Sequence, residues 1–155
     1  MNHFHLAQIN IAQARDSMES ETMKGFVDRL DEINALADKS PGFVWRLQTE
    51  EGDATSIQAF EDPNLIVNMS VWESIETLKH YVYKTAHVEL IRDRDAWFSK
   101  IKTVHQTLWW VPAGHIPTVS EGKEKLAILQ SNGPSQQAFT FAKPFPQPNT
   151  EHTAV

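Results

Sequence analysis

Hydrophobic and polar residues alternate along four stretches of this chain and recur at helical spacing along others. Alternation sends successive side chains to opposite faces of a strand, so it predicts strands over residues 3–11, 43–49, 65–72 and 103–111. Apolar residues three and four apart predict helices over residues 20–39 and 74–100, the second with a kink near Thr85, where its apolar stripe changes phase. A third helix is predicted to begin after Thr118, which has Glu121 three residues on, and to end at Gly133.

Two shorter stretches are less regular. Residues 56–60 are interpreted as a short strand or a loop, and residues 139–141 as an edge strand. The order of all these elements predicts an α+β fold, with an antiparallel ferredoxin-like sheet and helices on one face. Prolines 144, 146 and 148 favour an extended chain end, so we expect one domain over residues 1–146 and a flexible tail over residues 147–155.

The alternation also sorts the strand residues into two faces. The more apolar set is expected to face the helices: Ala7, Ile9, Ile11, Val67, Met69 and Val71. The opposite face should then carry amides, hydroxyls, a guanidinium, an imidazole and indoles: Gln8, Asn10, Arg46, Asn68, Ser70, Trp72, His105, Thr107 and Trp109. Such a face is either the wall of a ligand pocket or a solvated sheet surface, and a second copy of the chain stacked on it would enclose it.

Composition narrows the function classes. The chain has 155 residues, a formal net charge of −6 and no cysteine. Acidic charge argues against nucleic-acid binding, and the lack of cysteine excludes thiol catalysis and disulfides. No targeting segment or membrane-spanning stretch is visible, so we expect a cytoplasmic protein. Five Trp and seven His are many for this length, and such side chains often line ligand pockets.

Four stretches carry a resemblance to a known family: SPGFVWRL at residues 40–47, NMSVWES at 68–74, YKTAH at 83–87 and LWWVPAGH at 108–115. They resemble a widespread bacterial family that has only a domain-of-unknown-function label, over residues 3 to about 146. That family is similar to the dimeric α+β barrel superfamily, which includes cofactor-free antibiotic-biosynthesis monooxygenases and small haem-degrading monooxygenases. The resemblance implies a homodimer of ferredoxin-like sheets with a ligand cavity in each protomer.

The resemblance also implies roles for individual residues. The cofactor-free monooxygenases use an Asn four residues before a Trp on the third strand, a pattern that Asn68 and Trp72 match. Arg46 and either Tyr81 or Tyr83 would assist them, and His87 or His105 would be the base. The haem-degrading members instead imply an Asn on the first strand, an aromatic residue on the second helix and an axial His, which Asn10, Tyr81 and His87 match.

The leading hypothesis is therefore a small oxidoreductase of monooxygenase type, acting on an aromatic or polycyclic small molecule in a cavity between the sheet and the helices, with either no cofactor or haem. The candidate catalytic residues are Arg46, Asn68, Trp72, Tyr81 and His87, and the candidate substrate-binding residues are Gln8, Asn10, Ser70, Tyr83, His105 and Trp109. One alternative is a haem-binding protein or haem-dependent enzyme with His87 as the axial ligand. Another is a non-catalytic small-molecule-binding or stress-response dimer. The expected partners are a small molecule and a second copy of the chain, and neither nucleic acid nor a membrane.

Overall fold

The computed structural model describes residues 3–17, 19–47, 64–84, 92, 94–99 and 105–148. In chain order, its elements are β1 (Phe4–Ala14), α1 (Lys24–Lys39), β2 (Phe43–Arg46), β3 (Leu65–Trp72), α2 (Ile75–Lys84), the 3-10 helix η1 (Arg94–Ala96), β4 (Phe98–Ser99), β5 (Gln106–Pro112) and α4 (Val119–Asn132).

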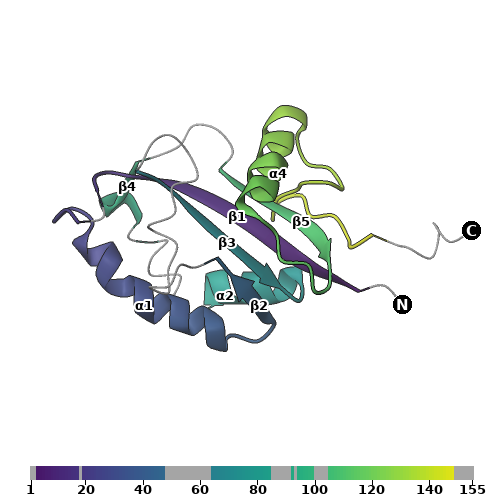
Figure 1. Ribbon diagram of the computed structural model, residues 1–155, viewed down its shortest axis with the longest axis horizontal. Helices are drawn as coiled ribbons and strands as arrows, with labels where there is room; N and C mark the ends of the chain where they lie inside the picture. Colours follow the sequence, from purple (N-terminus) through teal and green to yellow (C-terminus); the bar gives the residue numbers. More distant parts are fainter. Residues whose placement is uncertain are drawn as a thin grey trace, which may run out of the picture.

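The strands form one antiparallel sheet with β1 at its centre (Figure 1). β3 pairs with one side of β1 and carries β2 on its outer edge, whereas β5 and the short β4 pair with the other side. The spatial order β2-β3-β1-β5, with α1 after β1 and α2 after β3, is the ferredoxin-like arrangement. The predicted fold class is therefore confirmed.

Helices lie on both faces of this sheet (Figure 1). Helices α1 and α2 cover the face that carries Leu6 and Trp72, where Ile33 and Ala37 of α1 and Leu78 and Tyr81 of α2 pack with them. We call this the α1–α2 face; Gln8, Asn10, Asn68 and Ser70 share it because they pair across the strands or alternate with these residues.

Helix α4 covers the opposite face, which we call the α4 face. Its members are the apolar set of the central strands together with two β5 residues and Leu126 of α4: Ala7, Ile9, Ile11, Val67, Met69, Val71, Trp109, Val111 and Leu126. The apolar set does face a helix, as predicted, but the prediction that all the helices lie on that one face is wrong, because α1 and α2 cover the opposite face. A uniformly apolar face requires a cover, and hydrophobicity alone does not say that the cover is the last helix of the chain rather than the first two.

A glycine lets α4 approach the sheet closely. A Cβ atom on Gly122 would lie 2.9 Å from Cδ1 of Ile9 and 3.2 Å from Sδ of Met69. The ends of this helix are those predicted: the Thr118 hydroxyl accepts from the backbone N–H of Glu121 at 3.1 Å, and Gly133 follows the last turn with a φ of 77°. The Glu121 side chain departs from the capping box, since its carboxylate binds Trp109 and His115 instead.

The remaining elements follow the sequence pattern in part. β3 spans the predicted residues 65–72, and Phe139 forms a bridge with Leu108 at the sheet edge. Phe98 was predicted to continue the second helix, but it lies in β4 opposite Ala14. The predicted kink near Thr85, the stretch 56–60 and the ends of the strands predicted over 43–49 and 103–111 lie outside the described residues.

Candidate functional site

A buried hydrogen-bonded cluster occupies the middle of the α1–α2 face. The Gln8 amide nitrogen Nε2 donates to Oδ1 of Asn68 at 2.7 Å and to Oγ of Ser70 at 2.8 Å. The Trp72 indole Nε1 donates to the same Ser70 Oγ at 2.9 Å. We call Gln8, Asn68, Ser70 and Trp72 the β1–β3 cluster, because strand pairing brings Gln8 directly opposite Ser70.

The members of this cluster differ sharply in exposure. Gln8 is 4% exposed, Ser70 7% and Trp72 0%, whereas Asn68 belongs to the exposed class. Buried polar groups need partners, and the three hydrogen bonds supply them. Asn68 is therefore the member of the cluster that a ligand can reach, and Asn10 lies directly opposite it on β1.

Trp72 is fully buried beneath the site and does not form part of its surface. Its N–H is already bound to Ser70, its ring stacks on Tyr81 with centroids 5.0 Å apart, and Phe43 contacts it edge-on at 5.4 Å. To donate to a substrate oxygen, the indole would have to break its bond to Ser70. Its spacing from Asn68 does place both side chains on one strand face, and the position it holds there is that of a core anchor.

Tyr81 and Arg46 lie next to the cluster on different elements. The Tyr81 hydroxyl donates to the backbone oxygen of Ile33 at 3.2 Å, and burial raises its pKa well above the ordinary value of 10.0. The nearby Arg46 charge acts in the opposite direction and Asp38 in the same direction, both less strongly than burial. Tyr81 therefore stays neutral over the physiological pH range and is not a general base there.

Arg46 supplies a cation at the edge of the cluster. It lies opposite Ser70 on the adjacent strand, its side chain is 12% exposed, and its Nε binds Oδ1 of Asp38 at 2.9 Å. The turn between α1 and β2 brings the two charges together, since Gly42 adopts a φ of 82° beside Thr77, where a side chain would not fit. Sequence reasoning missed Asp38, because no pattern along the chain pairs a residue near the end of a helix with one on the next strand.

Two predicted substrate-binding residues lie on the other side of the sheet. The β1–β5 register puts Trp109 opposite Ala7, on the α4 face, and the alternation puts His105 on that face as well. The prediction that they share a face with Asn68 is wrong, because polarity was used to choose the face of β5 and the register reverses it. Trp110 is the β5 indole that packs with the hydrophobic residues of the α1–α2 face, and its N–H donates to the backbone oxygen of Phe145 at 2.9 Å.

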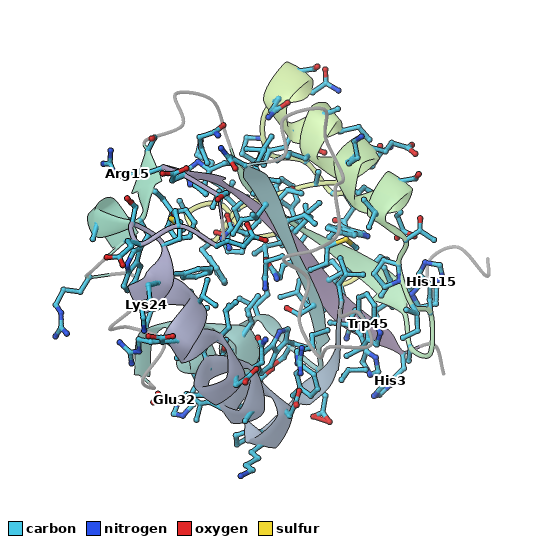
Figure 2. The ribbon with its side chains drawn as sticks, turned by 60° about the vertical axis from the view of Figure 1, so that its left-hand side comes forward. His3, Arg15, Lys24, Glu32, Trp45 and His115 are labelled. Atoms are coloured by element: carbon cyan, nitrogen blue, oxygen red, sulfur yellow. The ribbon has the colours of Figure 1, made fainter. Side chains whose placement is uncertain are left out.

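Trp109 belongs instead to a second polar chain at the start of α4. Its Nε1 donates to Oε2 of Glu121 at 2.9 Å, and Oε1 of Glu121 lies 2.7 Å from Nε2 of His115. This arrangement ties α4 to the sheet. Figure 2 shows His115 at the end of the molecule where His3 also lies.

Tyr83 also lies apart from the β1–β3 cluster. It is 51% exposed, contacts Phe141 at 6.1 Å between centroids, and borders a shallow surface groove of about 610 Å³. The other residues lining this groove are Glu76, Lys79, His80, Phe141 and Ala142.

His87, predicted as the haem ligand and, with His105 as the alternative, as the base, lies outside the described residues. Within the described part of the chain, no three His, Asp or Glu side chains converge as a metal site. No helix in those ranges is both long and apolar enough to cross a membrane.

The order and pairing of the elements define the chain as a ferredoxin-like α+β protein. Residues 5–155 match the domain of unknown function DUF3291, and the chain belongs to that family. Comparison with curated protein sequences finds no significant match.

Several solved structures are similar in fold. SnoaB, a cofactor-independent oxygenase from Streptomyces nogalater, is 14% identical with a TM-score of 0.47, over 74% of this chain and 98% of its own. NE2512, a protein of unknown function from Nitrosomonas europaea, is 13% identical with a TM-score of 0.47, over 74% and 96%. PA3566 from Pseudomonas aeruginosa is 13% identical with a TM-score of 0.46, over 72% and 95%. At this level of similarity the activity of SnoaB is a property of SnoaB alone, and the function of this chain has to follow from its own side chains.

Proposed function

We propose that this protein is a monooxygenase-type oxidoreductase that acts on an aromatic or polycyclic small molecule bearing an ionisable hydroxyl group. The observation that carries the proposal is the Asn68 amide. Its oxygen accepts from the buried Gln8, so its Nδ2 hydrogens are left for a ligand, on the side of the sheet that α1 and α2 cover. A fixed amide donor suits an oxygen atom on which negative charge develops.

The substrate supplies all four electrons that reduce O₂, so no other reductant is needed. The phenolate form of the substrate transfers electrons to O₂, and a ring carbon that carries hydrogen forms a new C–O bond. The O–O bond then breaks, one oxygen stays on the ring as a carbonyl, and the other leaves as water with the hydroxyl proton and the ring proton. A phenol and O₂ thus give a quinone and H₂O, with atoms and electrons balanced.

Each residue of the site has a separate role in this reaction, which follows from its position. Asn68 donates to the substrate oxyanion, a kind of hydrogen bond whose removal costs roughly 10²–10³ in rate. Arg46 adds positive potential beside Ser70, reduced by its ion pair with Asp38. The rings of Trp72 and Tyr81 stack on each other beneath Asn68 and Arg46.

The titratable groups that flank the cluster also bear on the pH dependence. Arg46 and Asp38 form an ion pair, and Tyr81 stays neutral because burial raises its pKa. His87 remains the predicted base. If the substrate instead enters as the phenolate, the rate rises with pH and follows the pKa of the substrate hydroxyl, which a series of phenols of different acidity reveals.

Oxygen uptake tests the proposal. Purified protein is supplied with a panel of hydroquinones and naphthols, without added metal or cofactor, in an oxygen electrode. We expect uptake with at least one member of the panel and a loss of about 10² in kcat in Asn68→Ala. The matched control is Asn132→Ala, an exposed asparagine at the end of α4, which should leave kcat unchanged. Ligand binding without oxygen uptake, or an Asn68→Ala variant as fast as the control, contradicts the proposal.

The chain is further proposed to act as a homodimer. Helix α4 packs on β1 and β5, and apolar residues farther across the same sheet face remain partly exposed: Val44, Trp45, Leu47 and Leu65. Figure 2 places Trp45 away from α1, which Lys24 and Glu32 mark, and toward His3 and His115. A second copy is the partner that would cover this surface, and its contribution to stability would come from apolar burial.

A further inference from the structure

In the β1–β3 cluster, Gln8 is the residue whose hydrogen bonds orient the others. Its Nε2 carries two hydrogens, and both are used, one toward Asn68 and one toward Ser70. Ser70 Oγ also accepts from Trp72, so both of its lone pairs are filled. The orientation of a single buried amide therefore determines the orientation of its neighbours.

The same contacts allow two directions of donation. With the Gln8 nitrogen toward Asn68, as in this structure, Asn68 turns its oxygen inward and presents N–H groups to a ligand. With the Gln8 oxygen in that place, Asn68 would turn its nitrogen inward and present its carbonyl oxygen. The first arrangement stabilises a bound anion, whereas the second stabilises a bound hydroxyl in its neutral form.

We propose that Gln8 is the positioning residue that directs the Asn68 amide nitrogen toward the ligand. Gln8 itself is 4% exposed and lies beneath Asn68 in the hydrogen-bonded cluster, so it acts through Asn68 and not by contact with substrate. Its predicted role as a substrate-binding residue is replaced by this one. The inference rests on the proposed function, because it explains how the donor of that site is oriented.

The probe for this inference is para-nitrophenol, whose phenolate and neutral forms have distinct visible absorption spectra. The full-length protein is titrated with the probe across a range of pH, and the apparent pKa of the bound probe is compared with that of the free probe. Donation from Asn68 to the phenolate lowers the pKa of the bound probe. A role of Gln8 in folding alone would not change the ratio of the two bound forms.

The variants separate the possible causes. Asn68→Ala should abolish the lowering of the probe pKa. Gln8→Met, which has nearly the same shape but no donor, should weaken the preference for phenolate about tenfold, the loss typical of one hydrogen bond to a charged group. Gln106→Met is the matched control, since Gln106 lies opposite Asn10 on the same face and should leave the probe pKa unchanged. In the double variant, Gln8→Met should add nothing to the effect of Asn68→Ala.

A second substitution keeps the test decisive if Gln8→Met does not fold. Gln8→Glu keeps the shape and offers only acceptors when ionised, so the Asn68 nitrogen should turn inward and the pKa of the bound probe should rise. Gln106→Glu measures the effect of the added charge by itself.

The outcomes distinguish the two proposals. If Asn68→Ala abolishes the lowering and Gln8→Met matches the Gln106→Met control, the positioning role is wrong while the proposed function stands. If the wild-type protein leaves the pKa of the probe unchanged, the donor site itself is wrong. A raised pKa in the wild-type protein means that Asn68 presents its oxygen, which overturns the positioning proposal directly.

Discussion

Trp72 and Asn68 show how two side chains on one strand face can have different roles. Trp72 has no exposed surface and holds Ser70 through its indole nitrogen, whereas Asn68 is exposed and ends the same hydrogen-bonded cluster. The i to i+4 spacing predicts that they share a face, and the register confirms it. Because Trp72 is buried, it belongs to the core, whereas the exposed Asn68 can contact a ligand.

This difference predicts losses of stability of different size in the two variants. Trp72→Phe removes the donor to Ser70 and part of the stacked ring, so the free energy of unfolding should fall by about 1–3 kcal/mol. Asn68→Ala removes an exposed side chain and one acceptor of the buried Gln8 amide, so the free energy of unfolding should fall less, by about 0.5–1 kcal/mol. Urea unfolding of both variants checks the pair, and equal losses in the two would contradict the assignment.

Tyr81 predicts a pH dependence of stability. Burial raises its folded-state pKa above 10.0, so the folded state keeps the proton at a pH where the unfolded chain has lost it. The stabilisation is fully present below pH 10.0 and is lost as the pH rises above it, by up to about 1.4 kcal/mol per pH unit. Tyr81→Phe should remove this loss.

Tyr83→Phe is the matched control, because Tyr83 is half exposed and the chain has only these two tyrosines. Its unfolding free energy should fall with alkaline pH as in the wild-type protein. A wild-type slope that survives in Tyr81→Phe would mean that another group is responsible.

Among the elements, α4 covers one face of the sheet, and α1 and α2 cover the other. Local patterns predict its boundaries well, since the Thr118 cap and Gly133 are signals within the helix ends themselves. They do not predict where it docks, because docking depends on Gly122 meeting Ile9, which is distant in sequence. The two-residue strand β4 is unpredictable for the same reason: only its pairing with Ala14 makes Phe98 a strand residue.

The close approach of α4 gives a direct prediction. Gly122→Leu would require space that Ile9 and Met69 fill, so the free energy of unfolding should fall by about 3 kcal/mol. Glu124→Leu places the same side chain at an exposed position of the helix and should change stability by less than about 0.5 kcal/mol. Thermal or urea unfolding measures both, and a tolerated Gly122→Leu would show that α4 does not pack through this glycine.

At the scale of the whole molecule, the two sheet faces have separate roles. Each face has a hydrophobic cluster, but only the α1–α2 face carries the hydrogen-bonded site, and only the α4 face carries the proposed dimer surface. Alternation on β1 and β3 places Gln8, Asn68 and Ser70 together from sequence alone. It could not place Trp109 and His105, because the register of β5 depends on pairing with a strand about a hundred residues earlier.

The dimer surface is tested by charge insertion. Trp45→Glu should weaken self-association at least about tenfold, since a buried aromatic anchor is replaced by a charge. Val27→Glu is the matched control, because Val27 is an exposed apolar residue on α1. Sedimentation velocity should show a dimer for the wild-type protein and the control and a monomer for Trp45→Glu. A monomeric wild-type protein would contradict the dimer without affecting the site.

In the proposed reaction, this chain oxygenates an aromatic hydroxyl compound at Asn68 using only O₂ and the electrons of the substrate. The most direct measurement supplies isotopically labelled oxygen gas with an accepted phenol and no added cofactor, and follows the label by mass spectrometry. We expect one labelled oxygen in the organic product and the other in water, with product formation lost in Asn68→Ala. A product oxygen derived from water, or both labelled atoms in the product, would contradict it.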